Sequence, residues 1–410
     1  MSLIVQKYGG TSVADVDLIR KAAQRAARVH REGNQVVVVV SAMGKTTDKL
    51  LEILYSLTRE PSERELDVLL STGEQVSISL LAAALHTMGV GAVSLTGSQA
   101  GIITDSNHCR ARILDIKKER IESELKAGKV VIVAGFQGAD FKGEITTLGR
   151  GGSDTTAVAL AAVLNADVCE IYTDVNGVYT IDPNMVPEAR KLPFISYDEM
   201  LEMANMGAKV MHPRAVEFGK KYKVKIHVRS SFNEEAGTII REVTSVEEKY
   251  IVSGIACDVN LAKIAIIGVP DKPGIAARIF TSIADEGINV DLIVQSIRKD
   301  GENDILFTVN KDELSKVLSI LERVLGQIGS KEIYYDEDVA KISIIGAGMA
   351  NSPGVAANMF KALAEQDINI EIISTSEIKV SCLIRRDKIN QAAEAVHKAF
   401  HLKEVKSPMV

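Results

Sequence analysis

The residues with the most distinct chemistry lie in Thr147–Asp154, with the sequence TLGRGGSD. Three glycines allow the backbone to approach a ligand closely. Arg150 carries a planar guanidinium that can grip a carboxylate or a phosphate, and it precedes the carboxylate of Asp154 by one helical turn of sequence. The stretch therefore predicts a site for an acid and a nucleotide phosphate. The alternative is a glycine-rich turn that binds nothing.

The flanking segments predict where this stretch sits in the fold. Residues 129–135 form a β-branched run that ends in glycine, which indicates a buried strand. Residues 155–164 are rich in Ala, Val and Leu and predict a helix, with Ser153 or Asp154 as its N-cap. We expect a loop that opens onto a helix, where free N–H groups and partial positive charge favour an anion.

A second stretch with chemical character is Lys7–Ser12, with the sequence KYGGTS. Its lysine ends a strand-like run beside two glycines, where the ammonium could meet the charge of a transferring phosphoryl group. A surface lysine before a turn is the plain alternative. Residues 44–46, GKT, have the ending of a Walker loop, but Val39 stands where that loop needs glycine, so this is not a P-loop.

Strand-like and helix-like patterns alternate along the first half of the chain, and these elements must position the two stretches. The expected elements are 3–5, 15–32, 35–41, 47–57, 63–88, 92–96, 120–127, 130–134, 155–164 and 170–173. Such alternation predicts a mainly parallel α/β sheet with helices on both faces. Ligands bind beyond the carboxyl ends of strands in such sheets, where loops 7–12, 41–47 and 147–154 would lie.

Residues 174–183, DVNGVYTIDP, follow the last of these strands and contain an Asn-Gly pair. That pair is typical of a tight two-residue turn. The segment therefore predicts a β-hairpin.

Composition limits the classes of function. The 410 residues allow two or three domains, and 46% hydrophobic with 25% charged residues is ordinary for a globular protein. A formal net charge of -6 gives no reason to expect nucleic acid or an anionic membrane as a partner. The four cysteines form no CxxC pair and HExxH is lacking, so no metal site and no disulfide framework is indicated. Without a leader pattern or an uncharged apolar run of about 18 residues, we expect a cytoplasmic protein.

An internal repeat occupies the last part of the chain. Residues 263–268, KIAIIG, and 272–277, KPGIAA, recur as 341–346, KISIIG, and 352–357, SPGVAA. Each copy continues as a helix, two strands and another helix, which gives a βαββαβ order in duplicate. The last helix of the second copy leaves only a short tail, so either this tail or residues 251–256, folding back, would supply its final strand.

Composition changes near residues 230–237, where small polar residues give way to a charged stretch. We therefore place the first domain at 1–240 and a linker at 241–250. The two repeats would be 251–335 and 336–410, with 251–257 as a strand that could swap into the second repeat.

Four motifs together resemble the aspartokinases: KYGGTS at 7–12, TLGRGGSD at 147–154, YTDVNGVY at 172–179 and GAKVMHP at 207–213. The resemblance covers essentially the whole chain, because that family has an amino-acid-kinase domain followed by two ACT domains. It implies a carbamate-kinase-like α/β/α sandwich and two C-terminal ferredoxin-like βαββαβ domains.

The resemblance further implies phosphorylation of L-aspartate on its side-chain carboxylate by MgATP, the first step toward lysine, threonine and methionine. By this analogy Lys7 and Lys209 would neutralise charge on the transferring group, and Asp154 would position them. Arg150 would clamp a substrate carboxylate and Glu74 the substrate ammonium. Since a carboxylate attacks in its ionised form, catalysis would need positioning and electrostatics rather than a general base.

The resemblance also implies the other contacts with substrate and nucleotide. Aspartate contacts are expected from Ser41, Thr47, Glu74, Arg150, Gly151 and Gly152. Nucleotide contacts are expected from Lys7, Tyr8, Gly9, Gly10, Ser12, Thr173, Asp174, Tyr179, Asp182 and Lys209. Asn184 departs from the arginine that often follows Asp-Pro in relatives, which puts one ATP contact in question. Mg²⁺ would be held through the nucleotide.

In each repeat a Pro-Gly pair opens a helix, whose N–H groups can receive an amino-acid carboxylate. Plain helix initiation is the alternative, but similarity to ACT domains implies effector binding, with lysine and threonine as the usual effectors and a coupling of ~1–3 kcal/mol. Candidate contacts are Asp271, Gly274, Ile275, Ala276, Asn289, Asp291, Gln295, Asn351, Gly354, Val355, Asn369 and Ile370.

ACT domains usually share sheets across subunits, so the resemblance implies a homo-oligomer. Some relatives add a shorter subunit begun from an internal start, for which a GTG codon at Val246 would serve. Two other functions stay open, namely a kinase for another acid such as glutamate, and an amino-acid sensor without catalysis. The two-ACT tail opposes the first, and the catalytic residue types retained at the four motifs oppose the second.

Overall fold

A computed structural model of the chain describes residues 1–208, 210–243, 251–297, 301–326, 332–350 and 352–403. The chain divides into two compact units. The first unit contains Met1–Tyr179, Lys191–Asn205 and Lys209–Glu247. The second unit contains Thr180–Arg190, Met206–Ala208 and Glu248–Val410. Two short segments from before residue 240 thus fold with the second unit, whereas the predicted boundary was a single cut in the chain.

The first unit is built on a mainly parallel sheet, as predicted. Among the described residues its eight strands follow the order β10-β12-β11-β9-β1-β2-β6-β3. Their bounds are β1 Leu3–Tyr8, β2 Gln35–Val40, β3 Ala92–Leu95, β6 Val130–Ala134, β9 Val168–Thr173, β10 Phe194–Ser196, β11 Ile226–Ser230 and β12 Thr238–Arg241. Neighbouring strands run parallel apart from the antiparallel pair β11 and β12.

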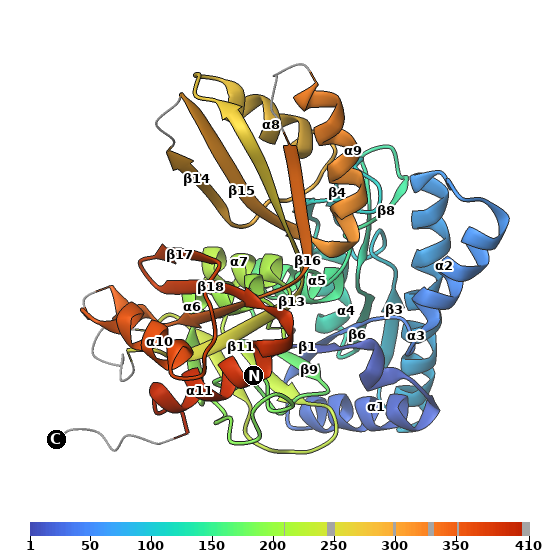
Figure 1. The fold of residues 1–410 in the computed structure, drawn as a ribbon. Coiled ribbons are helices and arrows are strands. Elements are labelled where there is room, and N and C mark those ends of the chain that lie inside the picture. Colours follow the sequence, from blue (N-terminus) through green and yellow to red (C-terminus); the bar gives the residue numbers. More distant parts are fainter. Residues whose placement is uncertain (209, 244–250, 298–300, 327–331, 351, 404–410) are drawn as a thin grey trace. The chain divides into compact units, whose positions relative to one another are not determined.

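Helices of the first unit cover this sheet. Their bounds are α1 Val16–Arg31, α2 Thr46–Leu57, α3 Glu63–Thr87, α4 Glu119–Lys126, α5 Gly152–Val163, α6 Tyr197–Asn205 and α7 Pro213–Tyr222, with a 3-10 turn η1 at Gly10–Val13 (Figure 1). In β2 the alternate residues Val36, Val38 and Val40 pack in one cluster with α1 and α3. The intervening Val37 and Val39 are equally buried, and α5 contacts β1, β2 and β9. A run of five valines therefore forms a strand that is buried on both faces.

A small second sheet in the first unit was not predicted. It has the order β5-β4-β7-β8, with β4 Ile102–Thr104, β5 Ile113–Ile116, β7 Gln137–Ala139 and β8 Ile145–Thr147. These strands have three or four residues each, too few for an alternating pattern to be recognised. The sheet matters for the site because β8 leads directly into the stretch Thr147–Asp154.

The helix α3 has the length and apolar composition of a membrane span. Half of that apolar stretch is buried inside the protein, and the same helix carries the buried acids Asp67 and Glu74. It is a core helix of the first unit.

The second unit contains the predicted repeat. Its six-stranded sheet has the order β14-β15-β13-β16-β18-β17 among the described residues. The strands are β13 Gly254–Pro270, β14 Ile293–Ile297, β15 Glu302–Asn310, β16 Glu332–Ile345, β17 Ile372–Ser376 and β18 Lys379–Arg385, and the helices are α8 Ile275–Ala284, α9 Leu314–Leu325, α10 Val355–Ala364 and α11 Ile389–Ala399 (Figure 1). Short 3-10 turns, η2 Lys311–Glu313, η3 Ala347–Met349 and η4 Arg386–Lys388, complete it.

The two repeats are joined through their longest strands. Residues Ala262–Pro270 of β13 pair with β15 of the first repeat, whereas Gly254–Asp258 pair with Lys341–Ile345 of β16. The early part of β16 in turn pairs with β13 from Ile267 to Lys263. Each long strand thus serves both repeats, and the segment that begins at Gly254 takes the final-strand position of the second repeat.

The hairpin predicted around the Asn-Gly pair does not form. β9 has parallel neighbours on both sides, and Asp174–Gly177 form a series of bends. Gly177 has φ +138, and a Cβ there would lie 2.6 Å from Thr238 Oγ1. The chain after β9 instead returns much later, through an isolated antiparallel bridge between Tyr179 and Lys191.

Candidate active site

The end of β1 and the start of α5 meet at one edge of the first unit's sheet. The Lys7 ammonium lies 2.7 Å from Asp154 Oδ1, and both side chains are only 11% exposed. A buried cation at this edge is held in place by the carboxylate rather than by solvent. Gly9 belongs to the same corner, since a Cβ on Gly9 would lie 3.3 Å from the Lys7 nitrogen.

The helix α5 begins earlier than the sequence predicts. It includes Gly152, Ser153 and Asp154, and its N-cap is Gly151 at φ +70 with no capping side chain. The prediction of Ser153 or Asp154 as N-cap is wrong, because both side chains bond elsewhere: Asp154 pairs with Lys7, and Ser153 Oγ accepts from Ser41 Oγ over 2.9 Å. A helix start without a capping side chain, preceded by the left-handed Gly149 and Gly151, is suited to an anion.

Glu74 lies in the middle of α3 and is almost completely buried. Its Oε1 accepts a hydrogen bond from the Ala42 N–H over 3.0 Å, and its Oε2 is buried with no hydrogen-bond partner. Burial raises the pKa of Glu74 to about 7. An orphaned buried carboxylate oxygen next to the end of β2 fits an ammonium group of a ligand, which would both pair with it and restore its ionised form.

The remaining residues expected to contact aspartate flank these groups. Ser41 follows β2 directly, and Thr47 lies in the first turn of α2. Arg150 is exposed between Gly149 and Gly151, which have φ +76 and +70.

His212 is a site residue that the sequence analysis did not single out. A Cβ on Gly151 would lie 2.2 Å from His212 Cγ, so the imidazole packs directly on that glycine. Burial, aided by Arg214, lowers the pKa of His212, which keeps the ring neutral. Its Nδ1 accepts from the Arg214 N–H, and the Arg214 guanidinium donates to the Leu148 carbonyl over 3.1 Å. The signal was present, because His212 belongs to the quoted GAKVMHP motif.

Asp67, also on α3, bonds to Thr147 at the start of the glycine-rich stretch, and the sequence analysis did not single it out. Its buried carboxylate accepts from the Thr147 hydroxyl, the Cys109 N–H and His108 Nδ1. The Cys109 carbonyl then lies where a Cβ on Gly149 would approach to 2.9 Å. Sequence gave no pattern for it, since one acid in a helix is ordinarily solvated.

Most of the residues expected to contact the nucleotide lie after β1 or around the end of β9. Gly10 packs against the Ala42 carbonyl, where a Cβ would approach to 2.9 Å, and the Ser12 hydroxyl lies 2.5 Å from that of Ser231. Thr173 is the last residue of β9, and its hydroxyl donates to Asp174 Oδ1 in the next position. The Tyr8 ring, however, lies in the core, so a contact from this residue would come from its backbone.

The Tyr8 ring belongs to a buried polar network under the sheet. It stacks on Tyr172 with ring centroids 4.8 Å apart, and Arg25 lies over the Tyr172 ring at 4.5 Å. Glu170 accepts from the Tyr172 hydroxyl and from Arg229. Burial raises the pKa of both tyrosines far above the usual range. The Tyr172 carbonyl accepts from the Gly9 N–H and the Ser12 hydroxyl, so this network holds β9 beside the loop after β1.

Three of the positions predicted from the sequence cannot be placed in the fold. Lys209 and Asn351 lie outside the described residues, as does Val246. Asp182 belongs to the second unit, and its Oδ1 accepts from both the N–H and the amide of Asn184. Among the described residues no group of three His, Cys, Asp or Glu side chains is placed to hold a metal.

Some of the candidate effector positions lie at the helix starts of the two repeats. Gly274 and Gly354 are the N-caps of α8 and α10, with φ +94 and +89, and Ile275, Ala276 and Val355 form the first turns. Asp271, Asn289 and Gln295 are exposed, whereas Ile370 packs on the second repeat's core. Asn369 lines a surface cavity of about 560 Å³ with Arg385 and Lys388.

The acid of each repeat pairs with a lysine of the other repeat. Lys341 of β16 binds Asp291, and Lys263 of β13 binds Glu371, positions that the repeat alignment makes equivalent. Lys341 is 1% exposed, and Lys263 is 21% exposed. An effector ammonium at Asp291 would therefore compete with Lys341 for the carboxylate.

The fold and site together define an amino acid kinase followed by two ACT domains. The model of the amino acid kinase family matches residues 2–230, and two ACT domain models match residues 263–326 and 342–400.

Full-length relatives give the narrower family. Aspartokinase from Geobacillus stearothermophilus is 50% identical over 404 residues, which cover 98% of each chain. Aspartokinase from Mycolicibacterium smegmatis is 49% identical over 410 residues, covering 98% of this chain and 97% of the relative. The chain belongs to the aspartokinase family.

Solved structures agree with this assignment. Aspartokinase III of E. coli in complex with aspartate and ADP superposes with a TM-score of 0.83 at 25% identity, covering 97% of this chain and all of that one. The same enzyme with lysine and aspartate gives a TM-score of 0.76. Aspartate kinase from Synechocystis is 47% identical with a TM-score of 0.54, covering 99% of this chain and 70% of that one.

Proposed function

We propose that this aspartokinase transfers the γ-phosphoryl group of ATP to the side-chain carboxylate of L-aspartate, giving 4-phospho-L-aspartate and ADP. The observation that carries the proposal is the pairing of two opposite sites at one sheet edge. Lys7, fixed by Asp154 beside the uncapped start of α5, attracts anionic groups, while the orphaned Glu74 carboxylate attracts an ammonium. An amino dicarboxylate and a nucleotide need both.

The proposed reaction is an in-line displacement. A carboxylate oxygen of aspartate forms a bond to the γ-phosphorus as the bond between that phosphorus and the β–γ bridging oxygen breaks. Lys7, and Lys209 with it, offset the charge on the transferring group, and Asp154 keeps the Lys7 ammonium at one place. Mg²⁺, bound through the phosphates, would supply further charge neutralisation. No proton leaves the nucleophile, so no general base is required.

Substrate orientation is assigned to the groups around this centre. Arg150 grips a carboxylate bidentately, Glu74 receives the ammonium, and Ser41, Thr47 and the N–H groups of Gly151 and Gly152 line the pocket. The backbone at Tyr8, Gly9 and Gly10 with the Ser12 side chain, and the residues Thr173, Asp174, Tyr179 and Asp182, serve the nucleotide. This division is supported by the E. coli relative, whose structure holds aspartate and ADP.

We further propose feedback control of a cytoplasmic biosynthetic step. The first committed reaction toward lysine, threonine and methionine would be inhibited by lysine, threonine or both at the helix starts of α8 and α10. The E. coli relative crystallised with lysine in its T-state supports an amino-acid effector. The protein would form a homo-oligomer through its ACT domains, and a shorter subunit from an internal start is a further possibility to test by mass spectrometry.

The test is acyl-phosphate formation trapped with hydroxylamine. L-Aspartate and L-glutamate are compared with MgATP, each alone and with lysine, threonine or both. We expect turnover of aspartate only, reduced by at least one effector. Turnover of glutamate at an equal rate would assign another acceptor, and thermal stabilisation by an effector without any turnover would indicate a sensor.

A further inference from the structure

The loop between β9 and β10 carries a short ladder of hydrogen bonds between its two stems. Its two stems run antiparallel: the Leu192 N–H donates to the Val178 carbonyl over 2.8 Å, and the Thr180 N–H donates to the Arg190 carbonyl over 2.9 Å. Between them Tyr179 bridges Lys191. The first and last of these steps belong to different units, since Thr180–Arg190 fold with the second unit.

In the first unit a buried threonine anchors the ladder. The Thr238 hydroxyl on β12 accepts from the Val178 N–H over 2.8 Å and donates to the Leu192 carbonyl over 2.6 Å. One side chain with no exposed surface thus joins both stems to the sheet that carries the active site.

In the second unit another buried threonine performs the same task. The Thr180 hydroxyl accepts from the Arg190 N–H over 3.0 Å and lies 3.2 Å from Nε2 of His397 on α11. The exposed fraction is 0% for Thr180 and 3% for His397. The Ile255 N–H donates to the Thr180 carbonyl, and Arg190 Nε donates to the Leu402 carbonyl. Both stems are therefore fixed within the second unit, by the contact of Thr180 with His397 and by the bonds to Ile255 and Leu402.

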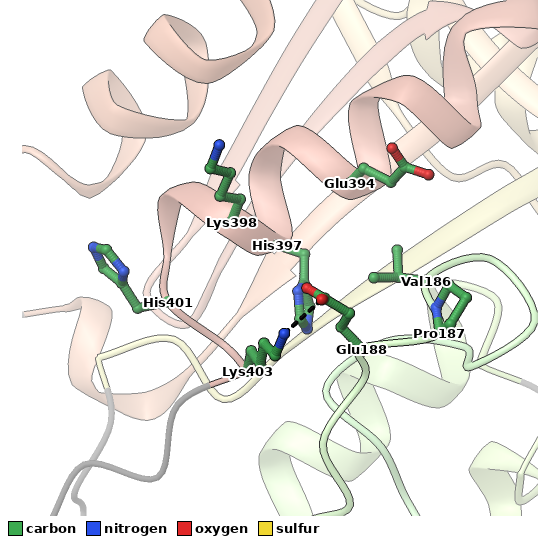
Figure 2. Close-up of a pocket in the computed structure, with 8 residues that line it drawn as sticks. All are labelled: Val186, Pro187, Glu188, Glu394, His397, Lys398, His401 and Lys403. Atoms are coloured by element: carbon green, nitrogen blue, oxygen red, sulfur yellow. Dashed lines mark hydrogen bonds and ion pairs between the residues drawn. The ribbon is translucent and has the colours of Figure 1, made fainter.

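The tip of the loop packs beside the same imidazole. Figure 2 shows His397 next to Glu188, which forms an ion pair with Lys403 across a cavity of about 410 Å³. Ile181 and Val186 are buried in the apolar cluster formed with α10 and α11. Burial, with smaller contributions from Arg190 and Lys403 that oppose Glu188, lowers the pKa of His397. A neutral Nε2 can then accept a hydrogen bond from the Thr180 hydroxyl.

We propose that His397 is a positioning residue for the nucleotide, because it holds through Thr180 the loop that carries Asp182. The inference rests on the proposed function only in taking Asp182 as a nucleotide contact. The neighbouring Asn184 already fixes Asp182 locally, which leaves the anchors to set the loop's position.

The first test measures MgADP affinity by calorimetric titration of the full chain, together with steady-state constants for MgATP and aspartate. Thr180→Val and His397→Leu are each expected to weaken MgADP binding and raise KM for MgATP by roughly three- to tenfold, the usual effect of one buried hydrogen bond. KM for aspartate and kcat should stay within about twofold, because the aspartate groups lie on other elements. Thr180→Ser should restore MgADP binding, and Lys398→Gln, on the same helix and cavity wall, is the matched control.

A double variant and a variant-free measurement complete the test. Because the two side chains act through one contact, the double variant should bind MgADP no more weakly than the weaker single variant. In the unmodified protein MgADP should slow amide exchange both in 180–190 and in 389–403. Folded variants that bind MgADP like Lys398→Gln, or protection by MgADP that leaves 389–403 unchanged, would overturn the inference. Absence of aspartate turnover would defeat the proposed function alone, since MgADP binding is measured without an acceptor.

Discussion

Glycines are used differently in the active site and in the helix starts of the ACT repeats. In the first unit a Cβ on Gly151 would lie 2.2 Å from His212, and one on Gly135 would lie 2.7 Å from the Ser153 hydroxyl. In the second unit a Cβ on Gly274 or Gly354 would meet nothing within 4 Å. The active-site walls are thus closed around their glycines, whereas the effector-side helix starts are open.

The difference separates two reasons for glycine. At Gly274 and Gly354 only the backbone requires it, since φ is +94 and +89. At Gly151 space and backbone both require it, and at Gly135 space alone does. Substitution of Gly274 or Gly354 should therefore lower stability and leave activity unchanged. Substitution of Gly151 should lower both stability and activity.

The largest effect is expected for Gly151→Ala. The added methyl would displace the His212 imidazole and the start of α5, so kcat/KM should fall by about a hundredfold or more, as for loss of a preorganised donor group. Gly128→Ala is the matched control, because Gly128 has φ +74 with open space around it. That control should lose about 1 kcal/mol of stability and keep its activity. Equal activity of the two variants would contradict the closed-site description.

A second effect concerns the buried acid Glu74. Its pKa is about 7 in the free protein, so kcat/KM for aspartate should rise as pH increases through 7 and the carboxylate becomes able to pair with the ammonium. Glu74→Gln should remove this limb and raise KM for aspartate roughly 10- to 100-fold, the effect of losing one charged hydrogen bond. Glu63→Gln, an exposed acid on the same helix, serves as control, and a limb that persists in Glu74→Gln would refute the assignment.

The same pKa determines a stability profile. The folded pKa of Glu74 is raised above its ordinary value of 4.5. Its contribution to stability is therefore fully present below about pH 4.5 and is lost as pH rises through about 7. Glu74→Gln should consequently unfold at a higher temperature relative to the wild type at pH 8 than at pH 5, which a pair of thermal scans would show.

The two ion pairs between the repeats, Lys341 with Asp291 and Lys263 with Glu371, test the second unit, where the open glycine positions lie. Asp291→Asn leaves Lys341, which is 1% exposed, without its countercharge, and should cost about 2–3 kcal/mol. Glu371→Gln leaves Lys263, which is 21% exposed and can reach water, and should cost below about 1 kcal/mol. Urea unfolding of the second unit, followed by circular dichroism, would measure both. Equal losses would mean that burial does not distinguish the two pairs.

The smallest effects are expected for Gly274→Ala and Gly354→Ala. Each side chain has room but takes a left-handed backbone, so each should lose about 1 kcal/mol with kcat and both KM values unchanged in the absence of effectors. Gly274→Asn should lose less than Gly274→Ala, because asparagine tolerates that conformation better. A loss of basal activity in either alanine variant would show that these helix starts act on catalysis directly.

Much of this design could be predicted from local patterns. The valine run of β2 indicated a buried parallel strand, and the repeated KIxIIG and PG segments indicated a duplicated βαββαβ order. Both signals depend only on residues that are neighbours in the sequence. The rule that ligand loops follow the carboxyl ends of strands placed loops 7–12 and 147–154 at one edge of the sheet. That Asp154 positions Lys7 was implied by the resemblance to the aspartokinases, and the two side chains do pair.

Other features depended on partners distant in sequence. The start of α5 was misplaced because Ser153 bonds to Ser41 instead of capping its own helix. The Asn-Gly turn failed as a hairpin because the Thr238 hydroxyl, contributed from β12, captures the chain after Gly177. Thr180–Arg190 fold with the second unit, where one of their contacts is with His397, more than two hundred residues later. No local propensity reports such contacts.

The sharing of β13 between both repeats has a consequence for synthesis on the ribosome. Gly254 pairs with Ile345, which is synthesised roughly 90 residues later. The start of β13 therefore stays unpaired for about 5–18 s at ordinary elongation rates. During that interval neither repeat can close, and an apolar strand end stands ready to pair with a neighbouring nascent chain. Slower translation of the segment between the two long strands should therefore favour misassembly, whereas faster delivery of β16 should protect the chain.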